Sequence, residues 1–269
     1  MSIDPTAVSR RLELARRIAH EAGQLTLRYF QRADLAVDLK ADQSPVTVAD
    51  REAEQLLRRK IEADFPGDAI LGEEFGERAG SSGYRWVLDP IDGTKSFVHG
   101  VPLYGTLVGV QHGEQDVIGV ICIPALGEMA YAARGQGAWY VRGPEPPVAA
   151  RVSTVQTLAD SLLLTTDAKS FSLRSSGHGA AAYDALQSAA RLTRTWGDCY
   201  GYLLVATGRA DVMVDPIMNV WDAAAVAPIV EEAGGRFSDW RGRPTISGGD
   251  GVASNGLVHE AVLRMCGTF

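Results

Sequence analysis

Apolar residues recur every three or four positions near the start of the chain, which is the period of one face of an α-helix. The repeating positions are Val8, Leu12, Ala15, Ala19, Ala22, Leu25 and Tyr29. Asp4 is suited to cap this helix and Pro5 to its first turn. A second amphipathic helix is expected over residues 47–64, where a Pro-Gly dipeptide follows. The polar residues 39–45 between the two helices predict a loop.

The next part of the chain has short apolar runs separated by turn residues, which is typical of β-strands. Strands are expected over residues 84–88, 103–111, 117–123, 128–133 and 138–141. Residues 143–147 are rich in Gly and Pro and form the most linker-like segment of the chain. We therefore expect an N-terminal α+β subdomain over residues 1–145 and a C-terminal α/β subdomain over residues 146–269.

Strand and helix patterns alternate in the second half. The expected strands are 162–165, 191–196, 211–214, 236–240 and 252–254, and the expected helices are 180–190, 199–207, 221–233 and 257–265. Such alternation predicts a layered α/β arrangement. The fold class expected for the whole chain is therefore α/β, with an α+β N-terminal half.

Composition limits the possible functions. The net charge of −7 makes the chain a poor candidate for binding a nucleic-acid backbone. No apolar run approaches the ~20 residues that span a bilayer, and no secretory signal is visible. The three scattered cysteines predict reduced thiols and a cytoplasmic location. A small anionic substrate stays possible, because a bound divalent cation can reverse the local field.

Candidate chemistry is concentrated in residues 86–94. An apolar strand delivers Asp89 and Asp92, and Pro90 and Gly93 shape a turn that lets the two carboxylates converge. Nearby carboxylates repel each other unless a cation lies between them, and a hard divalent cation prefers such oxygen ligands. The alternative is structural, since Asp-Pro and Asp-Gly pairs are also ordinary turn formers.

Further acidic residues lie at the ends of other predicted elements. Glu73 and Glu74 follow a short apolar stretch, Asp222 follows Trp221 near a helix start, and Asp50 lies near the start of the second helix. Taken singly, each suits a solvated charge or a helix cap.

Together these segments resemble both sequence signatures of the inositol monophosphatase superfamily. The matching residues are Asp50, Gly72-Glu73-Glu74, Asp89-Pro90-Ile91-Asp92-Gly93-Thr94 and Trp221-Asp222-Ala223-Ala224. The resemblance covers nearly the whole chain. It implies a layered αβαβα sandwich of the inositol monophosphatase and sugar phosphatase type, and a homodimer.

Within the superfamily, the chain is most similar to the histidinol-phosphate phosphatase branch. The residues that carry this likeness are Lys95-Ser96-Phe97 and the runs 194–202 and 205–216. Asp198 stands where inositol-type enzymes typically carry a small or hydroxyl residue. The branch implies a phosphoric monoester hydrolase that converts L-histidinol phosphate to L-histidinol and phosphate in histidine biosynthesis.

The resemblance also implies a site that holds two or three Mg²⁺ ions. It assigns the first ion to Glu73, Asp89 and the Ile91 carbonyl, the second to Asp89, Asp92 and Asp222, and a looser third to Glu73 through water. Thr94 and Glu73 would orient the attacking water, with Asp50 accepting from the Thr94 hydroxyl. Backbone N–H groups around Gly93 and Thr94 would bind the phosphate.

The other end of the substrate carries an ammonium and an imidazole. Asp198 and Asp215 would supply negative charge for these groups, and Asp222 lies on the substrate side of the expected metal site. Arg194 could pair with either aspartate or reach the phosphate, and it could equally be a surface strand residue.

Other functions stay open at this stage. Inositol-1-phosphate, 3′-phosphoadenosine-5′-phosphate and fructose-1,6-bisphosphate are alternative substrates. A haloacid-dehalogenase-type phosphatase needs two aspartates two positions apart, whereas Asp89 and Asp92 are three apart. A non-catalytic, metal-dependent regulatory protein of the same superfamily is the alternative outside enzymes.

Overall fold

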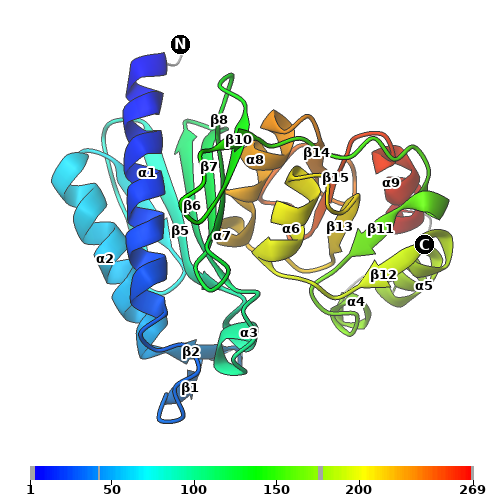
Figure 1. Cartoon of the computed structure of the whole chain (residues 1–269), viewed down its shortest axis with the longest axis horizontal. Coiled ribbons are helices and arrows are strands. Elements are labelled where there is room, and N and C mark those ends of the chain that lie inside the picture. Colours follow the sequence, from blue (N-terminus) through cyan, green and yellow to red (C-terminus); the bar gives the residue numbers. More distant parts are fainter. Residues whose placement is uncertain (1–3, 42, 175–177, 268–269) are drawn as a thin grey trace.

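The structure is a computed structural model that describes residues 4–41, 43–174 and 178–267. Its elements are stacked in the order helix, sheet, helix, sheet, helix, which Figure 1 shows from left to right. This arrangement confirms the layered α/β sandwich that the sequence predicts.

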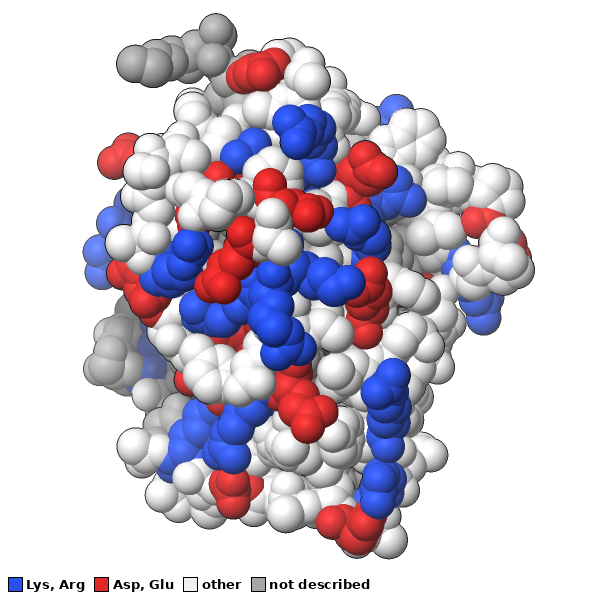
Figure 2. Space-filling view, turned by 90° about the vertical axis from the view of Figure 1, so that its left-hand side faces the viewer, with Lys and Arg blue, Asp and Glu red and all other residues white. Residues whose placement is uncertain are grey.

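The first helical layer consists of α1 (Pro5–Thr26) and α2 (Val48–Asp64). The Asp4 side chain caps α1 by accepting the Thr6 N–H, as expected. Figure 2 shows the face that these helices form, where acidic and basic side chains are intermixed. Ion pairs such as Arg17–Asp64 join the two helices across this face.

The segment between α1 and α2 is more ordered than a simple loop. It contains two short antiparallel strands, β1 (Val37–Leu39) and β2 (Pro45–Thr47). Lys40 therefore lies at the start of a hairpin turn, where its N–H donates to the Ser44 carbonyl.

The large sheet has eight strands in the order β10-β9-β8-β7-β6-β5-β3-β4. They are β3 (Ala69–Gly72), β4 (Gly76–Arg78), β5 (Tyr84–Asp92), β6 (Gly105–His112), β7 (Gln115–Ile123), β8 (Glu128–Ala133), β9 (Ala138–Arg142) and β10 (Val148–Ala149). The five predicted strands are present, β3 is the short apolar stretch whose strand end was expected before Glu73, and β4 and β10 were not predicted as strands. Since β10 pairs with β9, the sheet extends beyond residue 145, and the proposed division into two subdomains stays a prediction.

The expected end of β5 at residue 88 is wrong, because the strand continues through Asp92. A bulge between Asp89 and Asp92 shifts its register with β6. A bulge tolerates Pro90, which has no N–H to donate, and pairing resumes where Asp92 faces Gly105.

The small sheet has five strands in the order β12-β11-β13-β15-β14. They are β11 (Leu162–Leu164), β12 (Leu192–Arg194), β13 (Val212–Asp215), β14 (Arg236–Ser238) and β15 (Gly251–Ser254). All of them fall within predicted strands or extend these by one residue.

Apart from α3, which lies beside β2, the remaining helices fill the space between the sheets and cover the small sheet. They are α3 (Thr94–Val98), η1 (Leu158–Asp160), α4 (Ser170–Leu173), α5 (Gly179–Ala189), α6 (Cys199–Ala206), α7 (Val220–Ala223), α8 (Val226–Glu232) and α9 (His259–Gly267). Within the described part of the chain, we find no helix whose length and apolar character would span a bilayer.

The prediction of one helix over residues 221–233 is wrong, because the structure has α7 and α8 there. Pro228 explains the interruption, since it has no N–H for the Ala224 carbonyl and its ring crowds that carbonyl. The junction lies against the large sheet at Gly119, where an added Cβ would come within 2.0 Å of the Ala225 oxygen.

Candidate active site

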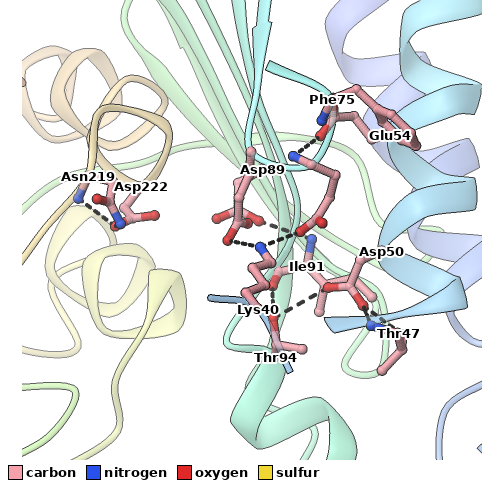
Figure 3. A network of polar contacts seen from close by, with 12 residues as sticks. Lys40, Thr47, Asp50, Glu54, Phe75, Asp89, Ile91, Thr94, Asn219 and Asp222 are labelled. Atoms are coloured by element: carbon pink, nitrogen blue, oxygen red, sulfur yellow. Dashed lines mark hydrogen bonds and ion pairs between the residues drawn. The ribbon is translucent and has the colours of Figure 1, made fainter. Parts of the chain in front are cut away.

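Three carboxylates converge between the two sheets. One oxygen from each of Asp89, Asp92 and Asp222 lies within 4.8 Å of the others. Asp89 is buried and the other two are half-buried. Figure 3 shows Asp222 on α7 facing Asp89 on β5 across the site. The structure thus brings together the three acidic residues that the family resemblance assigned to one ion.

Local structure explains how these side chains are aimed. The β5 bulge allows Asp89 and Asp92 to approach the same space, and the Asp89 carboxylate accepts the Ile91 N–H at 3.1 Å. Gly93 has a φ of 87°, which turns the chain into α3 and favours glycine. On the opposite side, Asp222 accepts the Asn219 N–H at 2.7 Å and so caps the start of α7.

The electrostatics of this cluster favour a cation. Burial, followed by the charges of Glu73, Asp92 and Asp222, raises the pKa of Asp89 well above its usual value. Burial also raises the pKa of Asp92, and it raises that of Asp222 to about 7. Because the donors are all oxygens and their charges repel, the cluster fits a hard divalent cation such as Mg²⁺.

Glu73 lies beside the three carboxylates, at the end of β3. Its N–H donates to the Leu88 carbonyl at 3.2 Å, which fixes it next to β5. Its carboxylate accepts from the Lys40 ammonium at 2.7 Å, and the same ammonium binds Glu74 at 2.6 Å. Lys40, whose role the sequence did not settle, therefore holds both glutamates from the β1–β2 hairpin.

Thr94, at the start of α3, and Asp50, near the start of α2, lie next to each other. The Thr94 hydroxyl lies 3.0 Å from the Ile91 carbonyl oxygen and 3.4 Å from Asp50 Oδ1. Asp50 Oδ2 accepts both the N–H and the hydroxyl of Thr47, which caps α2. Burial raises the pKa of Asp50 to about 6. Asp50 thus takes part in the N-terminal capping of α2 and also contacts Thr94.

Glu54 is a residue that the sequence analysis missed. Its buried carboxylate accepts the backbone N–H groups of Glu74 at 2.7 Å and Phe75 at 3.2 Å. Figure 3 shows Glu54 beside Phe75. Arg58, one helical turn later, donates to it at 2.7 Å. A charged residue one turn after Asp50, on the face that carries Leu57, is the signal that could have revealed it.

Two adjoining cavities open beside the carboxylates. The smaller has a volume of about 260 Å³, and its wall includes Asp92 and Asp222. The larger has a volume of about 620 Å³, and its wall includes Glu73, Gly93 and Thr94. The residues that line both are Lys95, Thr166, Asp167, Asp198 and Ile217.

Asp198 packs closely against Gly93. A Cβ added to Gly93 would lie 2.7 Å from Asp198 Oδ2, so only glycine fits there. Burial, followed by the charge of Asp215, raises the pKa of Asp198 to about 7. The next residue, Cys199, donates its N–H to Asp92, which ties this wall to the carboxylate cluster.

The other two predicted substrate residues lie differently. Asp215 lines the smaller cavity but is buried and already accepts hydrogen bonds from the protein. Arg194 is exposed on β12, where it donates to the Thr193 carbonyl at 2.7 Å, and it lies outside the described lining of both cavities. The structure therefore favours the surface alternative for Arg194.

Comparison with known proteins agrees with this geometry. The chain matches the inositol monophosphatase family over residues 7–266. It is 48% identical to a histidinol-phosphatase of Chlorobaculum parvum, over 90% of this chain and 91% of that protein. It is 39% identical to the histidinol-phosphatase of Mycobacterium tuberculosis, over 94% and 96% of the two chains.

Solved structures show the same fold. The extragenic suppressor protein SuhB from Bartonella henselae has a TM-score of 0.87 and 27% identity, covering 96% of this chain and 98% of its own. An inositol monophosphatase from Zymomonas mobilis has a TM-score of 0.82 and 34% identity, covering 97% and 98%. The resemblance predicted from the motif residues is confirmed: this chain belongs to the inositol monophosphatase family, whose members are metal-dependent phosphomonoesterases.

Proposed function

We propose that this protein is a Mg²⁺-dependent phosphatase that hydrolyses L-histidinol phosphate to L-histidinol and phosphate. The observation that carries this proposal is the convergence of Asp89, Asp92 and Asp222, two of which, Asp92 and Asp222, line a cavity together with Asp198. The similarity to proteins named histidinol-phosphatases, at 48% and 39% identity, supports the choice of substrate. The family match favours this chemistry over the haloacid-dehalogenase alternative.

The acidic residues would hold two or three Mg²⁺ ions. Asp89, Asp92 and Asp222 would bind one ion, and Glu73, Asp89 and the Ile91 carbonyl another, with a looser third beside Glu73. Bound Mg²⁺ lowers the pKa of water from about 15.7 toward neutrality and offsets negative charge on the leaving oxygen.

The chain's own residues would position the reacting groups. The Thr94 hydroxyl can accept a proton from the attacking water as its own proton passes to the Asp50 carboxylate. Glu73 would orient the same water, and the N–H groups of Gly93 and Thr94 would bind phosphate oxygens. The water oxygen then forms a bond to phosphorus, the ester P–O bond breaks, and the leaving alkoxide takes a proton from a solvent water to become an alcohol, while Asp50 later returns its proton to solvent.

Negative charge near the leaving group accounts for the preferred substrate. Asp198 lines both cavities and would face the ammonium and imidazole of histidinol phosphate. A neutral polyol such as inositol-1-phosphate gains little from this charge. We further propose that the protein is cytoplasmic and forms a homodimer. Light scattering on the purified protein tests the homodimer by its molecular mass.

The proposal is tested by phosphate release with Mg²⁺ and with a chelator. We expect the highest kcat/KM on histidinol phosphate, lower values on inositol-1-phosphate and fructose-1,6-bisphosphate, and no activity with the chelator. Loss of an outer-shell partner of a metal site costs about 10- to 100-fold in activity. Asp222 is a proposed direct ligand, so Asp222→Asn should reduce kcat/KM by more than this. The matched control is Asp184→Asn, an exposed aspartate on α5.

Two results would contradict the proposal. One is the lack of phosphate release from any monoester in the presence of Mg²⁺, which would favour the regulatory alternative. The other is an Asp222→Asn variant that is as active as the Asp184→Asn control.

A further inference from the structure

We propose that Asp167, together with an apolar rim formed by Ile217 and Leu173, selects the cationic, ring-bearing end of the substrate. This inference rests on the proposed function and deepens it, because it names the groups that distinguish histidinol phosphate from a neutral monoester. It also replaces Asp215 by Asp167 as the second selecting carboxylate.

The wall of the smaller cavity is strongly acidic. Its carboxylates belong to Asp92, Asp167, Asp198, Asp215 and Asp222. Asp92 and Asp222 are part of the proposed metal cluster, so three carboxylates remain for the substrate. Lys95 is the one Lys or Arg in the described lining, which leaves a net negative wall that suits a cation.

Asp215 has little capacity left for a ligand. Its Oδ1 accepts the Thr166 N–H at 2.9 Å and the Thr165 hydroxyl at 3.3 Å, and its Oδ2 accepts the Tyr202 hydroxyl at 2.8 Å. The side chain is also buried. We therefore infer that Asp215 is a positioning residue, which holds the strand end after β11 and the Tyr202 ring.

Asp167 has the capacity that Asp215 lacks. It follows β11, and its Oδ1 accepts the Lys169 N–H at 2.9 Å, which fixes the side chain in a tight turn. Among the described residues, none donates a hydrogen bond to its Oδ2. An ionised carboxylate oxygen of this kind can accept from an ammonium, and such a charge-assisted bond is strong.

Asp167 and Asp198 lie on one wall because their segments are tied together. The Asp198 N–H donates to Thr166 Oγ1 at 3.0 Å, one residue before Asp167. The two segments also touch at Gly197, where an added Cβ would lie 2.2 Å from the Thr166 Cα. Both aspartates line both cavities, so a substrate ammonium can be bound between them.

Apolar side chains complete the selecting wall. Ile217 is 53% exposed and Leu173 is 65% exposed, yet both line the smaller cavity. Large apolar residues at the rim of an acidic pocket are suited to a ligand that has an apolar face as well as a charge. An imidazole ring has such a face, and a polyol does not.

The experiment uses Asp167→Asn, which keeps the Oδ1 acceptor of the turn but removes the charge. Steady-state kinetics are measured on histidinol phosphate and on its analogue without the amine. Loss of a charge-assisted hydrogen bond predicts an about 10- to 100-fold lower kcat/KM on histidinol phosphate. The amine-free analogue should change by less than about threefold. Ile217→Ser should weaken both substrates by about tenfold, because both carry the ring.

Two variants separate this role from folding. Asp167→Glu keeps the charge and should retain the preference for the amine-bearing substrate. Asp184→Asn removes a charge away from the cavities and should leave the kinetics unchanged.

The outcomes distinguish the inference from the proposed function. Equal losses on the two substrates with Asp167→Asn, or no loss on either, would overturn the role of Asp167. A wild-type preference for histidinol phosphate in the same assay would leave the proposed function intact. If the wild-type protein hydrolyses the amine-free analogue and inositol-1-phosphate with the same kcat/KM as histidinol phosphate, both the role of Asp167 and the proposed substrate are overturned.

Discussion

Substitution of Glu54 can separate effects on metal binding from effects on overall folding. Glu54 holds the turn next to Glu73 but is absent from the described lining of both cavities. Its carboxylate is fully buried and accepts from two consecutive backbone N–H groups and from Arg58. Gly72 allows this contact, since an added Cβ would lie 2.0 Å from Glu54 Oε1. We consider Glu54→Ala and the milder Glu54→Gln.

The cost to stability follows from the groups left behind. Removing one partner of a buried ion pair costs about 3–5 kcal/mol of unfolding free energy. Arg58 keeps its bond to the Gly76 carbonyl and its side chain is 13% exposed, so the lower end of this range applies to Glu54→Ala. At roughly 2–4 °C per kcal/mol, a loss of about 3 kcal/mol lowers Tm by about 6–12 °C.

The effect on function should appear in metal binding. Without the Glu54 carboxylate, the turn after β3 loses the bonds that fix its backbone, and Glu73 can leave its place beside Asp89. Loss of such an outer-shell partner weakens metal binding by about 10- to 100-fold. We expect Glu54→Gln to raise the Mg²⁺ concentration for half-maximal activity by this factor, with a smaller change in the KM for substrate. Calorimetric titration with Mg²⁺ measures the same shift without turnover.

Glu62→Gln is the matched control, because Glu62 is exposed on the same helix. It should change neither Tm nor the Mg²⁺ dependence. If Glu54→Gln lowers Tm but leaves the Mg²⁺ Kd and the half-activating concentration unchanged, Glu54 is only a structural residue and the reasoning is refuted.

Two further predictions concern the site itself. Thr94→Val should lower kcat by about 10²- to 10⁴-fold, because it removes the hydroxyl between Asp50 and the water. Thr94→Ser keeps the hydroxyl and should keep most activity. Equal losses of kcat in the two variants, measured in a stopped assay of phosphate release, would count against this role. Burial raises the pKa of Asp50 to about 6 and those of Asp198 and Asp222 to about 7. Without metal, the native state therefore keeps protons that the unfolded chain releases, and the unfolding free energy should fall as pH rises from about 4 to about 7. Urea denaturation with a chelator measures this fall, saturating Mg²⁺ should reduce it, and a rise would contradict the assignment.

Local patterns were enough to predict the elements that depend on short-range chemistry. The first helix was predicted from its apolar period and from Asp4 and Pro5 at its start, and the structure confirms it. The convergence of Asp89 and Asp92 could also be predicted, because both lie in one short turn-rich motif. The helix break at residues 224–225, before Pro228, was missed because the apolar pattern continues through it, although the missing N–H of Pro228 is visible in the sequence.

Contacts between distant segments could not be predicted in the same way. Glu54 and Glu74 are far apart in the sequence, and their contact depends on how α2 packs on the large sheet next to the turn after β3. The same holds for Lys40, whose ammonium reaches Glu73 from a separate hairpin. Arg194 looked suitable because it lies close to Asp198 in sequence, but the strand β12 ends between them and leaves it exposed.

The placement of the site between two sheets has a functional consequence. Asp89 and Asp92 belong to the large sheet, whereas Asp167 follows a strand of the small sheet and Asp198 precedes α6. The Cys199 N–H, directly after Asp198, donates to Asp92, so one hydrogen bond joins the proposed metal cluster to the proposed selecting wall. Because this bond would fix the selecting wall relative to the metal cluster, a substrate whose charge lies at the wrong distance from its phosphate could not engage both at once. Preference for histidinol phosphate would therefore arise from the spacing between the metal cluster and the selecting wall as well as from their charges.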